Sequence, residues 1–166
     1  ALDEEQFLTA TGRELARLPL DPRIGRMVLA AKEEGSLAEV LVIAAALSVQ
    51  DPRERPLDRQ QAADQAQQRF DDAKSDFIAY LKLWKFFEEA LAHKKSNAKL
   101  REACHQHFLS YLRLREWRDI HHQLKELVSE MGWKVGDLRE DPHSVYLQVH
   151  RALLTGLLGN VGMKAE

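Results

Sequence analysis

The chain has 166 residues, 45% of them hydrophobic and 30% charged, and its formal net charge is −2. This composition predicts a folded core and argues against an intrinsically disordered chain. It also argues against a polycation that coats nucleic acid non-specifically, because the net charge is slightly negative. A lone cysteine, Cys104, excludes an intramolecular disulfide and fits a reducing compartment.

No signal for export or for membrane insertion is visible in the sequence. Acidic residues at positions 3–5 stand where a signal peptide has a basic segment. The longest apolar run, residues 40–47, is far shorter than the roughly 20 residues that span a membrane. We therefore expect a cytoplasmic protein without a membrane partner. The start at Ala1, without a Met, predicts a fragment of a longer protein.

The N-terminal third is expected to hold three helices. A short first helix ends at Pro19. Asp21-Pro22 combines an N-cap residue with proline at the first helical position, so a second helix begins there and ends at Gly35. The segment Ser36-Leu-Ala-Glu39 is typical of a capping box and predicts a third helix that runs to about Val49.

A segment with two prolines, residues 50–58, predicts an extended and stiff connector. Residues 59–73 are polar and rich in Ala and Gln, which favours a helix. Ser75 or Asp76 can cap the next helix, over residues 76–92. The apolar face expected for that helix holds five residues: Phe77, Tyr80, Leu81, Trp84 and Leu91.

The longest predicted helix covers residues 100–131 and ends at Gly132. Apolar residues, mostly at steps of three and four, predict its buried seam: Leu109, Leu112, Trp117, Ile120, Leu124, Leu127 and Met131. Glycines and a proline interrupt residues 132–142, and a last helix is expected over residues 144–158. The predicted fold class is all-α, with at most a minor short β element near the N-terminus.

The sequence predicts no catalytic centre. A phosphate-binding loop needs a Gly-Lys dipeptide, which does not occur, and neither a nucleophile elbow nor a paired-histidine zinc motif is present. Cys104, His105 and His107 lie close along one helix, but structural zinc takes four ligands, usually as two separated pairs. The favoured alternative is a cysteine packed at a helix edge beside solvated histidines. We therefore expect no catalytic residue, metal or cofactor in this chain.

The helices predicted over residues 22–34 and 37–49 are joined by a Gly-Ser turn, as in a helix-turn-helix that reads DNA. A recognition helix needs polar side chains that reach base edges. Residues 40–47 are apolar on every side of the helix, which is typical of a buried element. We therefore expect a structural role for this pair of helices.

Positive charge is concentrated between residues 93 and 125, a segment that contains eight Lys or Arg and only three acidic residues. Four basic or titratable residues there are spaced by three, four and three: Arg115, Arg118, His122 and Lys125. This spacing predicts one basic stripe along the long helix, which suits the phosphate backbone of a nucleic acid. The alternative is a solvated face with internal ion pairs, such as Arg115 with Asp119.

The connector carries Arg53 and Arg55 on a backbone that its prolines stiffen. A stiff backbone loses little entropy on binding, so these guanidinium groups suit a phosphate or carboxylate ligand. In the alternative interpretation both arginines pair with acids of the connector itself: Asp51, Glu54 or Asp58.

Several segments are modest signals singly but specific as a set, because they occur in a fixed order. They include Leu8-Thr-Ala-Thr-Gly-Arg-Glu-Leu-Ala16, Ser48-Val-Gln-Asp-Pro-Arg-Glu-Arg-Pro56, Ser75-Asp-Phe-Ile-Ala-Tyr-Leu81, Phe108-Leu-Ser-Tyr-Leu-Arg-Leu-Arg-Glu-Trp-Arg-Asp-Ile120 and Val145-Tyr-Leu-Gln-Val-His-Arg-Ala-Leu-Leu154. Over about residues 5–160 the chain resembles the helicase-associated region of DEAH-box RNA helicases, in particular of the bacterial members.

The resemblance implies a partial, degenerate winged-helix domain over residues 1–55 and a helical-bundle, or ratchet-like, domain over residues 56–166. In this family two ATP-binding motor domains lie upstream and an oligonucleotide-binding-fold domain lies downstream, so ATP and Mg would bind outside this chain. The accessory domains close a tunnel for single-stranded RNA. The candidates to face that RNA are Arg53, Arg55, Ser75, Asp76 and Lys82.

Two functions follow as hypotheses. In the first, the chain is the accessory segment of an ATP-dependent RNA helicase and has no enzymatic activity of its own. Its partners are then single-stranded RNA and the motor and oligonucleotide-binding-fold domains of the same parent chain. In the second, the chain is a helical scaffold that docks other proteins and binds no nucleic acid.

Overall fold

A computed structural model describes residues 22–93 and 96–165 of the chain. Within these ranges the structure holds seven α-helices, three short 3-10 helices and no strand. An isolated antiparallel bridge joins Arg53 to Leu109. The all-α prediction is therefore confirmed for this part of the chain. The first predicted helix, up to Pro19, lies outside the described residues, as does the start of the chain, near which a minor β element was allowed.

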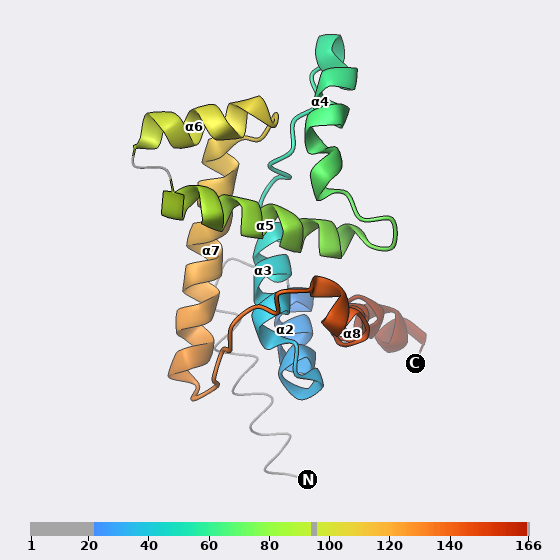
Figure 1. Cartoon of the computed structure of the whole chain (residues 1–166). Coiled ribbons are helices and arrows are strands. Elements are labelled where there is room, and N and C mark those ends of the chain that lie inside the picture. Colours follow the sequence, from blue (N-terminus) through green and yellow to red (C-terminus); the bar gives the residue numbers. More distant parts are fainter. Residues whose placement is uncertain (1–21, 94–95, 166) are drawn as a thin grey trace. The chain divides into compact units, whose positions relative to one another are not determined.

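The helices follow one another in the order that Figure 1 labels. The α-helices are α2 (Pro22–Glu34), α3 (Leu37–Leu47), α4 (Gln60–Gln67), α5 (Asp76–His93), α6 (Asn97–Gln106), α7 (Tyr111–Glu130) and α8 (Tyr146–Ala165). The 3-10 helices are η1 (Leu57–Arg59), η2 (Gln68–Phe70) and η3 (Pro142–Val145). The predicted helix over residues 59–73 is thus α4 followed by η2, and α8 runs beyond the predicted end at residue 158.

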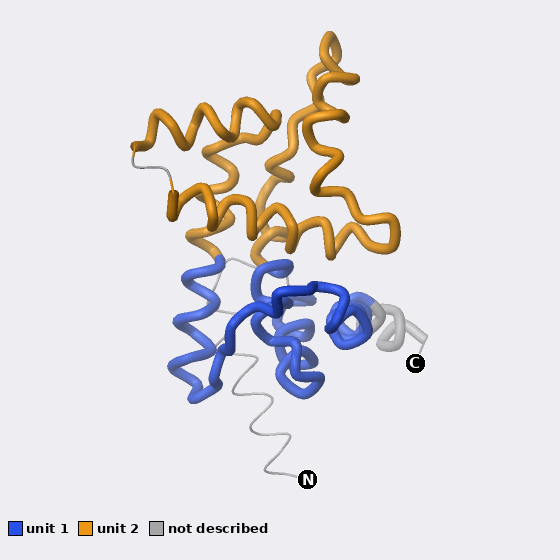
Figure 2. The backbone as a smooth tube through the Cα atoms, viewed as in Figure 1, with its two compact units in different colours: residues 1–44, 121–166 blue, residues 45–120 orange. Residues whose placement is uncertain are grey.

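The chain divides into two compact units, which Figure 2 colours separately. Unit 1 comprises residues 1–44 and 121–166, and unit 2 comprises residues 45–120. This division by compactness differs from the border that the sequence predicted between residues 55 and 56. That border concerns family domains and stays a prediction.

In unit 1, helix α2 packs against α8. The four residues of its predicted stripe are all buried: Ile24, Met27, Val28 and Ala31. Gly156 permits a close approach of the two helices, because a Cβ at this position would lie 2.7 Å from the carbonyl oxygen of Arg23. Helix α3 is buried on every side from Leu37 to Ala46, which supports the structural role expected for it.

The turn between α2 and α3 begins as predicted but is held differently. Gly35 has φ +74°, a conformation that favours glycine, and the N–H of Ser36 donates to the carbonyl of Ala31 at 3.0 Å. The predicted capping box is wrong, because the buried Ser36 hydroxyl has no hydrogen-bond partner among the described residues. The buried Glu39 carboxylate instead accepts from the backbone and guanidinium N–H groups of Arg139, at 3.0 and 2.8 Å. This distant partner offsets the cost of burying the carboxylate.

The long helix predicted over residues 100–131 is wrong as a single element, because it is broken between α6 and α7. The N–H of Leu109 donates to the carbonyl of Cys104 at 2.9 Å, and Phe108 takes φ 55°. Ser110 then caps α7, since its hydroxyl accepts from the N–H of Arg113 at 3.3 Å. The break is invisible to hydrophobic spacing, because apolar residues continue at helical steps across it.

The break also corrects the buried seam of α7. Four of its apolar residues have no exposed surface: Leu114, Trp117, Leu124 and Val128. Leu112, a predicted member of the seam, is 67% exposed. In unit 2 the ring of Trp117 packs on that of Trp84, with 5.1 Å between the ring centres. Helix α7 ends at Glu130, just before Gly132 (φ +83°), which is close to the predicted end.

The corrected seam can be tested with two substitutions of the same chemistry on one helix. Leu114→Ala removes a fully buried side chain, so we expect it to lower the free energy of unfolding by about 2–5 kcal/mol. Leu112→Ala removes an exposed one and should change that energy by less than about 0.5 kcal/mol. Urea titration followed by tryptophan fluorescence measures both. Equal losses would contradict the corrected seam.

Candidate nucleic-acid interface

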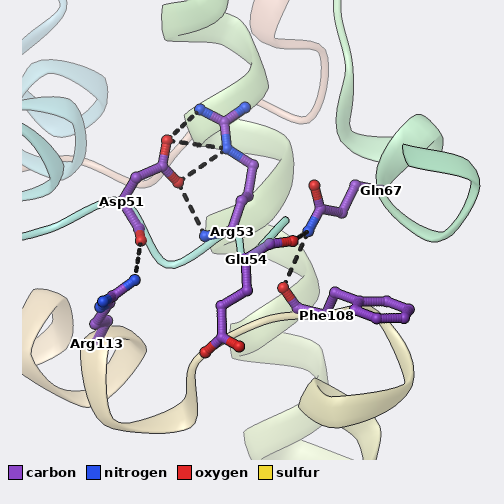
Figure 3. Close-up of polar contacts among 6 residues, drawn as sticks. All are labelled: Asp51, Arg53, Glu54, Gln67, Phe108 and Arg113. Atoms are coloured by element: carbon purple, nitrogen blue, oxygen red, sulfur yellow. Dashed lines mark hydrogen bonds and ion pairs between the residues drawn. The ribbon is translucent and has the colours of Figure 1, made fainter. Parts of the chain in front are cut away.

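In unit 2 the connector is hydrogen-bonded to the turn between α6 and α7. We call residues 51–54 and 108–110 together the connector corner, and Figure 3 shows its polar contacts. The N–H of Glu54 donates to the carbonyl of Phe108, and the N–H of Ser110 donates to that of Pro52, both at 2.7 Å. The amide of Gln67 donates to the carbonyls of Glu54 and Phe108 at 2.9 and 3.0 Å. Gln67 is 9% exposed, so α4 holds the connector corner through a buried side chain.

Arg53 lies in the connector corner and pairs with Asp51. Its guanidinium donates to both carboxylate oxygens at 2.7–3.3 Å, and its backbone N–H donates to one of them at 2.9 Å. Burial acts to raise the pKa of Asp51, but the hydrogen bonds from Arg53 and the charges of Arg53 and Arg113 prevail and lower it. Arg113 also donates to the carbonyl of Asp51 at 3.1 Å, as Figure 3 shows. Arg53 thus stabilises the connector internally, as the alternative interpretation proposed.

Arg55 also has a carboxylate partner, but not one that the sequence suggested. It donates to both oxygens of Asp64 in α4, at 2.9 and 3.0 Å. More than half of each side chain is exposed, and exposed ion pairs are weak because water screens them. A phosphate could therefore compete for Arg55 more easily than for Arg53. Contact of either arginine with RNA stays a prediction.

The three remaining candidates from the family resemblance lie at the start of α5. The Ser75 hydroxyl accepts from the N–H groups of Phe77 and Ile78 at 3.1 and 3.4 Å, so Ser75 is the predicted cap of α5. Asp76 is exposed in the first turn of α5. Lys82 donates to the carbonyl of Asp71 at 3.0 Å and lies 3.4 Å from the carboxylate of Asp72. All three therefore belong to unit 2 with Arg53 and Arg55.

The predicted basic stripe is exposed along α7. All four of its members are exposed, Arg115 and Arg118 in unit 2 and His122 and Lys125 in unit 1. His122 lies 3.0 Å from the carboxylate of Glu126, one turn further along. The stripe is thus accessible to a ligand and contains one internal pair, so both interpretations of its charge remain open.

A groove of about 780 Å³ in unit 2 collects residues that the sequence analysis did not bring together. Three arginines line it, and each guanidinium lies over an aromatic ring of the same groove. Arg59 lies 4.9 Å from the ring centre of Phe108, while Arg101 and Arg115 lie 5.1 and 5.9 Å from that of Tyr111. We call this site the arginine groove.

Sequence reasoning found Arg115 but missed Arg59, Arg101, Phe108 and Tyr111 as partners in one site. Arg59 follows the connector, Arg101 belongs to α6, and Tyr111 opens α7, so the three elements meet only in the folded unit. The available signal was the interleaving of basic and aromatic residues from position 101 to 115, which is typical of surfaces that bind single strands.

The described residues contain no group of three or more His, Cys, Asp or Glu side chains that could hold a metal ion. Cys104 is fully buried, and burial raises the pKa of its thiol to about 11, so the thiol stays protonated at neutral pH. The ring of His107 packs on those of Phe70 and Phe86, and its Nδ1 is 2.9 Å from the carbonyl of Ala103. The packed cysteine is as predicted, but His107 is half-buried rather than solvated.

Comparison with known proteins shows what this chain is similar to. Residues 21–80 match the family described as helicase-associated domain (HA2), ratchet-like. The chain is 45% identical to the ATP-dependent RNA helicase HrpA homolog of Haemophilus influenzae over 97% of its length, and 48% identical to the ATP-dependent RNA helicase HrpA of Escherichia coli over 95%. The DExH-box ATP-dependent RNA helicase DExH1 of Arabidopsis thaliana is 34% identical over 97% of the chain.

These comparisons confirm the family resemblance that the ordered segments predicted. The match over residues 21–80 runs across the predicted border at residue 55, so the division into winged-helix and ratchet-like domains is still a prediction. The chain spans 12% of the length of each HrpA protein and 16% of DExH1. Among the described residues no helix is long and apolar enough to span a bilayer.

The role of Gln67 in the connector corner can be measured directly. Gln67→Ala leaves two carbonyls without their side-chain donor in a part-buried place, so we expect a loss of about 1–3 kcal/mol in the free energy of unfolding. Gln65→Ala is the matched control, because this amide is exposed on the same helix. Chemical denaturation measures the free energy of unfolding of both variants. Similar losses for the two would contradict the role of Gln67 in the connector corner.

The Asp51–Arg53 pair predicts a pH dependence. The pKa of Asp51 lies below its ordinary value of 3.8 in the folded state, so its stabilisation is present above pH 3.8 and is lost as the pH falls through the folded pKa. Asp51→Asn should therefore lower the free energy of unfolding by about 1 kcal/mol at neutral pH. The difference from the wild type should shrink below pH 3.8. Urea titrations between neutral pH and about pH 3 test this, and a constant difference would contradict it.

Proposed function

We propose that this chain is an accessory segment of an ATP-dependent DEAH-box RNA helicase and guides single-stranded RNA beside the motor domains. The observation that carries the proposal is the similarity, over nearly the whole chain, to proteins named as ATP-dependent RNA helicases. In this proposal the parent protein hydrolyses ATP with Mg in domains outside the chain. The segment itself holds no catalytic residue and acts only by contact.

Charge on the surface supports contact with the phosphate backbone rather than with base edges. The basic side chains of the α7 stripe and of the arginine groove are exposed, and such side chains suit phosphates. Helix α3, which a helix-turn-helix reader would need as its recognition helix, is buried instead. The segment would therefore hold a strand without reading its sequence, as suits a protein that moves along RNA.

Salt dependence of binding tests this function with the chain as it stands. We expect a fluorescent oligouridylate of about 12 nucleotides to bind weakly at low salt and to dissociate as salt rises, because each phosphate contact releases a counterion. The logarithm of the binding constant should fall by about 0.7 per contact for each unit in the logarithm of the salt concentration. Fluorescence anisotropy over a salt series measures this slope.

The result also separates the RNA-guiding segment from a protein-docking scaffold. Absence of binding at low salt, or binding that is indifferent to salt, would favour the scaffold and overturn the proposal. A phosphate-release assay on the chain alone is the accompanying control. Turnover of ATP there would contradict a purely accessory role.

A further inference from the structure

Five arginines of unit 2 differ in the partners that they contact. Arg53 and Arg55 each hold a carboxylate through a bidentate pair, with Asp51 and Asp64 respectively, and Arg53 also lies 5.2 Å from the ring centre of Tyr80. The three arginines of the groove make no ion pair with a carboxylate in the part of the chain that the structure describes: Arg59, Arg101 and Arg115. Their contacts are with the rings of Phe108 and Tyr111. Their charges are therefore available to an external anion.

The rings prepare these arginines for a ligand. A cation over an aromatic face is held by the electron density of the ring, and its N–H donors can still bind a phosphate. Holding a long side chain in advance reduces the entropy that is lost on binding. The ring of Tyr111 contacts the guanidinium groups of both Arg101 and Arg115, so one side chain positions an arginine of α6 and an arginine of α7.

The groove has a mixed lining that fits a nucleic-acid strand better than a free small anion. Glu54 and Glu102 also line it, so the three arginines leave a single net positive charge, with His105 beside them. A lone phosphate gains little from such a lining. A strand can set its phosphates against the arginines and a base against an aromatic ring, because every base has a face that stacks. The volume of the groove, about 780 Å³, is in the range of sites that bind small molecules, so the groove itself would hold only a short part of a strand.

We propose that the arginine groove binds single-stranded RNA, with Arg59, Arg101 and Arg115 on phosphates and Tyr111 stacked on an unpaired base. The inference rests on the proposed function and names its contact surface. It assigns the main phosphate contacts to the groove, whereas Arg53 pairs with Asp51 within the connector and Arg55 holds Asp64 of α4 in an exposed pair.

The phosphate contacts are tested with the triple variant Arg59→Ala/Arg101→Ala/Arg115→Ala. Loss of three contacts should reduce the salt slope of oligouridylate binding by about 2 and lower the affinity at low salt at least about tenfold. Lys99→Ala is the control, because it removes an exposed cation from α6 that does not line the groove. Circular dichroism should be unchanged for both, since all four side chains are exposed.

The stacking contact is tested with Tyr111→Leu and two probes of equal length. One probe is the oligouridylate and the other is an abasic ribose-phosphate strand. We expect Tyr111→Leu to weaken the oligouridylate about tenfold and the abasic strand much less, because only the first offers bases to the ring. Tyr111→Phe keeps the ring and should bind both probes as the wild type does.

Each outcome decides between the groove and the broader function. If the wild type binds RNA with salt dependence but the triple variant matches Lys99→Ala, the groove is overturned and the RNA-guiding role stands. If the wild type binds no RNA at low salt, both are overturned. Tight binding of an oligoglutamate peptide that the triple variant abolishes, with RNA binding unaffected, would make the groove a protein site and would also overturn the inference.

Discussion

The connector corner is the interaction on which unit 2 depends. Two main-chain hydrogen bonds of 2.7 Å and the two donated by Gln67 fasten the proline-rich connector to the turn between α6 and α7. These bonds satisfy backbone groups that neither segment can satisfy in a helix, which lets Phe108 take φ 55° and Ser110 begin α7. Glu54, Phe108, Leu109 and Ser110 of this corner also line the arginine groove, so the same hydrogen bonds hold part of the groove in place.

Local chemistry was enough to predict most helices. Pro22 and Gly35 mark the two ends of α2 and Ser75 caps α5, as predicted, because each signal acts within about one turn of the chain. The break after α6 could not be predicted in this way. Its partners, Pro52, Glu54 and Gln67, lie some forty residues or more before it, and the apolar spacing continues through it. Tertiary hydrogen bonds overrode a helical pattern that is locally consistent.

The same limit applies to charge. Sequence spacing identified Arg53, Arg55 and the α7 stripe as cationic, but pairing depends on which acids the fold brings near. Arg55 of the connector pairs with Asp64 of α4, nine positions away. Glu39 pairs with Arg139, a hundred positions away, whereas local reasoning placed it in a capping box with Ser36. Basic character can therefore be predicted from a sequence, whereas the availability of a charge cannot.

In our proposal, the availability of the charge separates the arginines that bind RNA from those that stabilise the fold. A guanidinium that already holds a carboxylate must give up that pair before it can bind a phosphate, so part of the gain is lost. A guanidinium that rests on a ring keeps its donors and much of its cation–π contact when the phosphate arrives. The RNA-guiding proposal thus places weak, repeated contacts at arginines supported by aromatic rings. Such contacts suit a segment past which a strand must move, because a deep ion-paired site would hold the strand in place.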